Sequence, residues 1–462
     1  MAERSAVPLE LGTEKISRLL KQYALPAIIA QTASSLYNMV DSIFIGQGVG
    51  PLAISGLAVT FPLMNLSTAF GTLVGAGAAT MLSVLLGQKN YKAANKVLGN
   101  VVTLNTIIGL VFMAVALIFI DPILYFFGAS ENTLPYAKEY ITIILIGNVV
   151  THLYFGLNAA MRSSGNPKKA MALTIFTVVF NTILDPIFIF VFDMGIAGAA
   201  WATVLAQTVA MILVMKHFSD KTRAFHFEKG IFKLDRRVAK DSLTIGMGPF
   251  LMNSAACLVT LFINQQLRDY SGDLGIGAYG ICNRFIFMFI MICMGLNQGM
   301  QPIAGYNYGA KQYSRVKEVF WMTAKLGTIV TTICFCIGMF IPRLAAGIFT
   351  HDEALLNMSE EGLRILTIGF PIVGFQMIGT NFFQCLGMVK KSIILSLSRQ
   401  LIFLLPLLYC LPLWMGANGV WMSFPISDVL SALLTAILLR RLFKKFNMLK
   451  DGEESAILGS NL

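Results

Sequence analysis

Long apolar segments alternate with short polar ones along the whole chain. About 20 apolar residues suffice for a helix to cross the hydrocarbon core of a membrane. About twelve such segments can be recognised, which predicts an all-α polytopic membrane protein. The predicted spans lie near residues 17–46, 53–86, 97–120, 136–162, 169–192, 195–217, 240–267, 276–308, 317–342, 356–386, 392–413 and 416–439.

Composition and charge agree with this pattern. The 462 residues are 56% hydrophobic and 13% charged, whereas a soluble protein carries about a quarter charged residues. The formal net charge of +11 comes from Lys and Arg in the loops on one side of the predicted spans, where the N-terminus, the segment 216–240 and the C-terminal tail also lie. Because cytoplasmic loops of membrane proteins are rich in Lys and Arg, we expect a plasma-membrane protein with both termini in the cytoplasm. The basic charge is then explained without a nucleic-acid partner, and we expect none.

The basic segment 216–240 divides six spans from six. We interpret it as a linker, although its phenylalanines also allow a helix lying on an anionic membrane surface. The expected organisation is an N-lobe at 1–217, a cytoplasmic linker at 218–239, a C-lobe at 240–443 and a cytoplasmic tail at 444–462.

The two halves carry an internal repeat. GQKNYKAANKV begins at Gly87 and GAKQYSRVKEV at Gly309, an offset of 222 in the numbering. SGNPKKA at 164–170 returns as LGMVKKS at 386–392 with the same offset. Such recurrence predicts two six-helix lobes of one fold, related by pseudo-two-fold symmetry.

Several motifs resemble those of the MATE (multidrug and toxic compound extrusion) family, in its prokaryotic branch of DinF-like and MepA-like exporters. They are LPAIIAQTASSLYNMVDSIFIG, GAGAATMLSVLLGQKNYKAAN, RSSGNPKKA, NTILDPIFIF, GIAGAAWAT and GLNQGMQPIAGYNYGAKQY. The resemblance covers essentially the whole chain. It implies an antiporter that exports amphipathic, mostly cationic compounds and is driven by H⁺ or Na⁺. We expect a monomer that is not an enzyme and needs no cofactor.

Three acidic residues lie well inside predicted spans: Asp41, Asp185 and Asp428. A carboxylate in the bilayer interior is costly and usually functional. Asn181 precedes Asp185 by four residues, so both lie on one helix face. Pro186 follows, and we expect a broken helix there.

The resemblance implies a cation site in the N-lobe and a substrate cavity. The cation site comprises Asp41, Asn181, Asp185, Thr203 and Tyr37, with Na⁺, if it is the coupling ion, held by Asp41, Asn181 and Asp185. The expected cavity residues are Asn38, Met39, Met64, Arg284, Met288, Gln298 and Asp428. Pro26 and Pro249, at nearly equivalent repeat positions, are candidate hinges.

The C-lobe lacks the acids of the N-lobe. Adding 222 to 41 and to 185 gives Ile263 and Leu407. Its intramembrane Arg399 cannot realistically lose its proton, so we interpret it as structural, with helix-terminal carbonyls or Asp428 as acceptors. For Arg284 the sequence leaves structural and transport roles open.

Two other functions are possible for this pattern. A lipid-linked oligosaccharide or lipid flippase of the same superfamily would also have two related lobes, but it would need a more basic cavity. An intramembrane aspartyl protease could use Asp41 and Asp185 as a dyad, but no GxGD-type motif is present.

Overall fold

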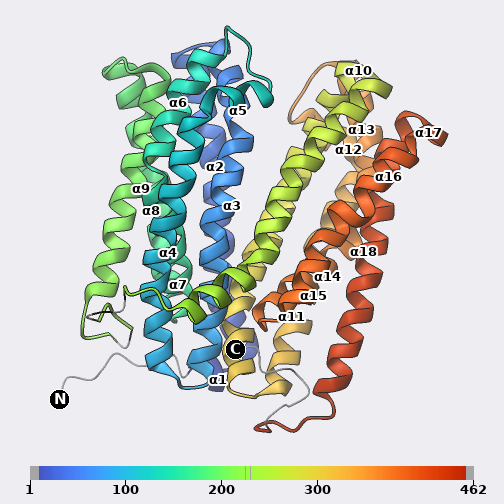
Figure 1. Cartoon of the computed structure of the whole chain (residues 1–462). Coiled ribbons are helices and arrows are strands. Elements are labelled where there is room, and N and C mark those ends of the chain that lie inside the picture. The colour runs from blue at the N-terminus through green and yellow to red at the C-terminus, as the bar shows by residue number, and fades with distance from the viewer. Residues whose placement is uncertain (1–9, 224, 229, 231, 454–462) are drawn as a thin grey trace. The chain divides into compact units, whose positions relative to one another are not determined.

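The computed structural model describes residues 10–223, 225–228, 230 and 232–453, and within them every regular element is a helix (Figure 1). The elements are α1 (Glu10–Thr13), α2 (Ile16–Gly48), α3 (Pro51–Gly87), α4 (Tyr91–Ile118), α5 (Ile120–Phe126), α6 (Leu134–Ile146), α7 (Asn148–Ser163), α8 (Pro167–Pro186), η1 (Ile187–Val191), α9 (Gly195–Ser219), α10 (Arg236–Gly309), α11 (Tyr313–Phe340), α12 (Pro342–Gly347), α13 (Glu353–Thr367), α14 (Phe370–Cys385), α15 (Val389–Leu397), η2 (Ser398–Leu404), α16 (Leu405–Cys410), α17 (Pro412–Met415) and α18 (Ala417–Phe446).

The helix boundaries repeat at the offset found in the sequence. α4 and α11 begin at Tyr91 and Tyr313 and end at Ile118 and Phe340, so both pairs of ends are related by that offset. It also relates α7 to α14 at both ends, and the first residues of α8 and α15 and of α9 and α18. The predicted repeat is therefore confirmed in the secondary structure.

Most predicted spans correspond to single long helices. Two of them, Arg236–Gly272 and Leu274–Gly309, are the parts of α10 on either side of the non-helical Gly272. Among the described residues, nine helices are long and apolar enough to cross a membrane, and two bent pairs bring the number to eleven. The pairs are α6 with α7, bent by 53°, and α13 with α14, bent by 55°. The remaining predicted span is α2, whose 33 residues correspond in the repeat to the spanning helix Arg236–Gly272.

The chain forms two compact units, and two helices contribute to both. Of the described residues, the first unit contains 10–13 and those of 29–250, and the second contains 14–28 and 251–453. The start of α2 therefore packs with the second unit and the start of α10 with the first. The sequence predicts a division at the linker. The structure differs in that residues 14–28 belong to the second unit and residues 236–250 to the first.

Glycines make the close contacts of both exchanged segments. In the first unit a Cβ on Gly246 of α10 would lie 1.7 Å from the carbonyl oxygen of Leu73 in α3. In the second unit a Cβ on Gly299 would lie 2.4 Å from the Cα of Ala24 in α2. Small residues let helices in membranes approach closely enough for backbone contact.

Equivalent helix pairs in the two units exchange large and small residues. In the first unit Asn105 of α4 packs against Gly156 of α7. At the equivalent positions of the repeat, Gly327 of α11 faces Ile378 of α14. A smaller side chain on one helix is thus matched by a larger side chain on the facing helix, so both units keep a close-packed interior.

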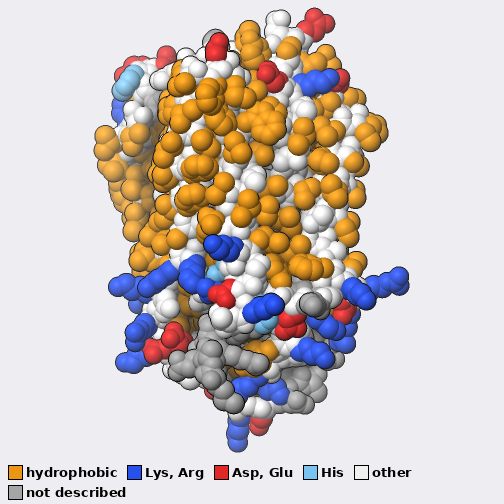
Figure 2. All heavy atoms as spheres, turned by 90° about the vertical axis from the view of Figure 1, so that its left-hand side faces the viewer, with side chains coloured by type: hydrophobic (Ala, Val, Ile, Leu, Met, Phe, Trp, Pro, Cys, Tyr) orange, Lys and Arg blue, Asp and Glu red, His pale blue; other side chains and the backbone are white. Residues whose placement is uncertain are grey.

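One face of the molecule is apolar over most of its length. Figure 2 shows hydrophobic side chains over this face, with Lys and Arg gathered near one end. Large apolar side chains are exposed along α8 and α9, including Ile183 and Ile212. A lipid-facing surface bounded by basic residues on one side accounts for this pattern.

The basic linker lies against α4. Asn95 donates to the carboxylate of Glu228 at 2.9 Å, and Thr103 donates to the carbonyl of Phe232 at 2.7 Å. The backbone N–H of Asp235 donates to Asn100 at 3.0 Å. The linker is therefore attached to the first unit by hydrogen bonds at several points.

Asp235 also caps α10, which gives a prediction on pH. Its carboxylate accepts from the backbone N–H groups of Val238 and Arg237, and these bonds, with the Lys96 ammonium, lower the pKa of Asp235. Because the pKa of Asp235 is lower in the folded state, its carboxylate stabilises the fold at pH values above the unfolded pKa of about 4. This stabilisation is lost as the pH falls through the pKa of the folded state.

Asp235→Ala is expected to destabilise the first unit by about 1 kcal/mol at neutral pH, and the difference from wild type should be smaller near pH 3, where the charge contributes less. Thermal unfolding in detergent at both pH values measures this. Asp235→Asn, which keeps a capping side chain without the charge, should lose less stability. An equal loss for Asp235→Ala at both pH values would contradict the assignment.

Candidate functional site

A buried polar cluster occupies the interior of the first unit. It combines side chains from four helices, α2, α6, α8 and α9. Asp185 of α8 is fully buried and Asp41 of α2 is 5% exposed. Asn181 and Thr203 beside them are also buried.

A chain of hydrogen bonds connects three helices of the cluster. The hydroxyl groups of Tyr37 and Thr203 are 2.8 Å apart. The Asn181 amide, oriented to satisfy both of its neighbours, donates to the Asp185 carboxylate at 3.1 Å and accepts from the Thr203 backbone N–H at 3.0 Å and from its hydroxyl at 3.3 Å. The predicted position of Asn181 and Asp185 on one helix face is thus confirmed.

Asp41 brings a second buried carboxyl group into this interior. Its Oδ1 atom is buried and has no hydrogen-bond partner. Asp41 interacts electrostatically with Asp185, so two carboxylates share one apolar interior. A buried charge without a partner is costly. Carboxylate, amide and hydroxyl oxygens are the ligands that hard cations prefer, and a proton would neutralise the same charge.

Tyr140 of α6 belongs to the cluster and was missed by the sequence analysis. It is buried and interacts electrostatically with Asp41, Tyr37 and Asp185. Its only sequence signal is a hydroxyl near the start of an apolar span. A single tyrosine of that kind is also common at membrane interfaces, so the pattern did not distinguish it.

The expected break in the helix beside Asp185 is a change of helix type instead. α8 ends at Pro186 and continues as the π-helix η1. Proline has no N–H to donate one turn back, and the wider π-helical turns accommodate this without a break in the span. π-helical segments are frequent at functional sites.

The second unit is apolar where the first has its cluster. Positions 37, 41 and 181 correspond to Val259, Ile263 and Phe403, and Val259 and Ile263 are buried in the hydrophobic core. In the first unit the large Tyr140 packs in one cluster with the small Ala199. At the equivalent positions of the second unit the small residue is Gly362 and the large one is Trp421, whose ring lies close to where a Cβ of Gly362 would be. This is the same exchange of large and small residues.

The other predicted site residues are dispersed. Met64 packs in the core of the first unit, where its sulfur accepts from Thr60. Arg284 and Met288 are exposed one turn apart on α10, and Gln298 is partly buried. Asp428 is buried in an ion pair with Arg399, so it is the acceptor among the two alternatives that the sequence left open for that arginine. The side chains of Asn38 and Met39 lie outside the described part of the chain.

The candidate hinge prolines lie next to the unit boundaries. The first boundary falls between Ile28 and Ile29, two residues after Pro26. The second falls between Phe250 and Leu251, one residue after Pro249. Pro26 lies inside α2 and Pro249 inside the span Arg236–Gly272 of α10, and each removes one backbone hydrogen bond from its helix.

Known proteins share both the sequence pattern and the fold. The family model MatE matches residues 26–187 and 245–410. The multidrug export protein MepA of Staphylococcus aureus (strain MRSA252) is 27% identical over 423 residues, which cover 92% of this chain and 93% of MepA. The solved structure of the MATE multidrug transporter DinF-BH in complex with rhodamine 6G is 36% identical, with a TM-score of 0.88 over 95% of this chain and 98% of DinF-BH.

A further solved structure supports the fold alone. It is the outward-facing conformation of a multidrug resistance MATE family transporter of the MOP superfamily, with 22% identity and a TM-score of 0.90. The match covers 97% of this chain and the whole of that structure.

Proposed function

The chain belongs to the MatE family of multidrug transporters, and we propose that it exports amphipathic, mostly cationic organic compounds in exchange for H⁺ or Na⁺. The observation that carries this proposal is the partnerless carboxylate oxygen of Asp41, which interacts electrostatically with Asp185. Two acids in one dry interior favour the uptake of a positive charge.

The coupling cation acts as a second substrate of the exchange. When it enters, Asp41 and Asp185 lose their mutual repulsion, and the chain from Tyr37 through Thr203 to Asn181 fixes the positions of the surrounding oxygens. When it leaves, the two charges again require compensation. The cluster therefore has two electrostatic states, and each favours its own packing of α2 against α8 and α9.

The prolines provide a route from this site to movement. α2 carries both Asp41 and Pro26, and it passes from the second unit to the first directly after the proline. A helix that lacks one backbone hydrogen bond bends more easily at that point. We propose that Pro26 and Pro249 are the hinges on which the two units rearrange during alternating access.

The remaining parts of the proposal concern the cellular setting. We infer a plasma-membrane location with both termini cytoplasmic, because Lys and Arg concentrate on the side that includes the linker and the tail. Rhodamine 6G, the ligand named in the structure of DinF-BH, is a suitable first test compound at 36% identity. We propose a monomer that needs no cofactor.

Thr203→Val gives a graded test of the cation site. It removes the hydroxyl that joins Tyr37 to Asn181 and leaves both with one partner fewer. Loss of about 1–1.5 kcal/mol of hydrogen bonding should raise the half-saturating concentration of the coupling ion roughly five- to tenfold. Export of rhodamine 6G at increasing ion concentration measures this. Thr203→Ser keeps the hydroxyl and should behave as wild type; an equal change in both variants would argue against the hydrogen-bonded chain.

The proposal as a whole is tested in inverted membrane vesicles. Export of rhodamine 6G should follow either an imposed pH gradient or an imposed Na⁺ gradient. If neither gradient moves this compound or several other cationic dyes, the flippase alternative becomes the better account, and lipid-linked substrates should be assayed next.

A further inference from the structure

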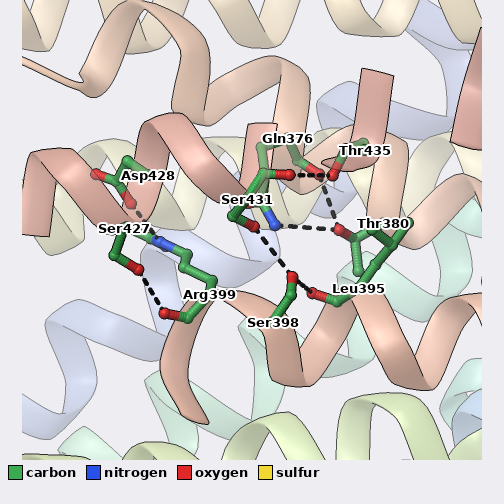
Figure 3. Close-up of polar contacts among 9 residues, drawn as sticks. All are labelled: Gln376, Thr380, Leu395, Ser398, Arg399, Ser427, Asp428, Ser431 and Thr435. Carbon is green, nitrogen blue, oxygen red and sulfur yellow. Dashed lines mark hydrogen bonds and ion pairs between the residues drawn. The ribbon is translucent and has the colours of Figure 1, made fainter. Parts of the chain in front are cut away.

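The second unit contains a buried ion pair of its own (Figure 3). Arg399 of η2 donates from Nε to the Oδ1 atom of Asp428 in α18 at 2.6 Å. Asp428 is 3% exposed, whereas the Arg399 side chain is 26% exposed. The acid is thus sealed in the interior, with the guanidinium on its more accessible side.

The surrounding residues form a site shaped for this pair. Ser427 donates to the backbone carbonyl of Arg399 at 2.6 Å, and Ser398 and Ser431 lie 3.2 Å apart between the same two helices. Gly369 at the α13–α14 bend leaves room for the acid, since a Cβ there would lie 3.0 Å from the Cβ of Asp428. Ser427 therefore holds the backbone that carries Arg399, and Gly369 leaves space for the side chain of Asp428.

The pair lies on the helices that correspond to those of the cation cluster. Helices α8 and α9 of the first unit are repeated as α15 with η2 and as α18. Arg399 precedes Phe403, the equivalent of Asn181, by four residues, and Asp428 follows Pro425, the equivalent of Thr203, by three. Each residue of the pair is thus displaced by about one helical turn from the position equivalent to the cluster. Because the two helices run antiparallel, both displacements have the same direction in space.

The two units meet the same electrostatic requirement differently. A carboxylate in an apolar interior needs a positive partner. In the first unit no side-chain cation pairs with Asp41 or Asp185 in the described part of the structure. In the second unit the positive charge is attached to the protein, and a guanidinium does not release its proton.

We propose that Arg399 acts as a tethered cation, which permanently occupies the carboxylate of Asp428 and leaves the second unit without an exchangeable ion. This inference rests on the proposed function, in which the first unit exchanges the ion. It follows that removal of the Arg399 side chain should convert Asp428 into a binding site for a free monovalent cation.

Cation-dependent thermal stability of the purified protein tests this directly. The parent is Asp41→Asn/Asp185→Asn, in which the cluster of the first unit is disabled. In this parent, Arg399→Ala should gain a saturable rise of a few degrees in Tm with millimolar guanidinium or with Na⁺. Urea, which resembles guanidinium but is neutral, should give none. The parent and the same variant with added Asp428→Asn should not respond.

Absence of a cation response in Arg399→Ala, or a response that persists after Asp428→Asn, would overturn the proposal. The paired substitution Arg399→Gln/Asp428→Asn in the otherwise native chain provides a second test if Arg399→Ala does not fold. It removes both charges, so rhodamine 6G export should follow the same ion gradient as in wild type. Loss of gradient-driven export in this folded variant would show that the charges themselves take part in transport.

Failure of the proposed function and failure of the proposed role of Arg399 give different results. Failure of the proposed function is seen as wild-type vesicles that do not respond to any gradient. The binding assay does not depend on transport, so it decides the role of Arg399 in either case.

Discussion

Asp41→Asn is expected to reduce gradient-driven export to the level of cells without the transporter. The substitution keeps the shape of the side chain but removes one of the two charges that attract the coupling cation. Because the Asp41 carboxylate has a buried oxygen without a partner, the amide costs the folded protein little. Accumulation of rhodamine 6G in cells that contain equal amounts of wild-type or variant protein in the membrane measures this.

Two variants serve as controls for this result. Asp121→Asn makes the same substitution in the same unit, at a surface carboxylate 2.8 Å from Lys138, and exposed ion pairs of this kind contribute little. Ile263→Ala changes the position equivalent to Asp41 in the second unit. Both should retain export. Wild-type export by a well-expressed Asp41→Asn protein would remove this residue from the mechanism.

Gly246→Ala is expected to have the largest effect on stability. A Cβ at this position would lie 1.7 Å from the Leu73 carbonyl oxygen, and a backbone atom cannot move aside as a flexible side chain does. The start of α10 must therefore separate from α3. Overpacking of this kind costs about 1–3 kcal/mol or more, and we expect the upper end together with loss of export. Thermal unfolding in detergent measures the destabilisation.

Gly280→Ala is the control in the other half of α10, beyond the kink at Gly272. A Cβ there meets no atom within 4 Å, so the variant gains only the higher helix propensity of alanine, about 1 kcal/mol in an exposed helix. Its stability should equal or exceed that of wild type. Similar stability of the two variants would contradict the close contact between α10 and α3.

Much of the fold follows from the internal repeat. The offset seen in short loop motifs also relates the ends of α4 and α11 in the structure. Helix boundaries are predictable here because Gly, Asn and Lys interrupt long apolar segments at corresponding places. The exchange of residues 14–28 and 236–250 between the units could not be predicted. It depends on contacts such as that of Gly246, which lie far apart in the sequence.

The site was predictable only in part. Asp41 and Asp185 stand out because acids are rare in spans, and helical spacing places Asn181 beside Asp185. Tyr140 does not stand out, since tyrosine occurs in many spans and its neighbours come from other helices. The partner of Asp428 was named among alternatives, because an arginine in a span needs an acceptor but the sequence does not show which one lies nearby.

The central claim is that a cation exchanged at the first unit drives export. The most direct test uses purified protein in liposomes and follows rhodamine 6G export together with the countermovement of Na⁺ or H⁺. We expect one of these ions to move inward in proportion to the exported compound, and both movements to be lost in Asp41→Asn. Export without any cation countermovement, or coupled exchange that persists in Asp41→Asn, would contradict the account.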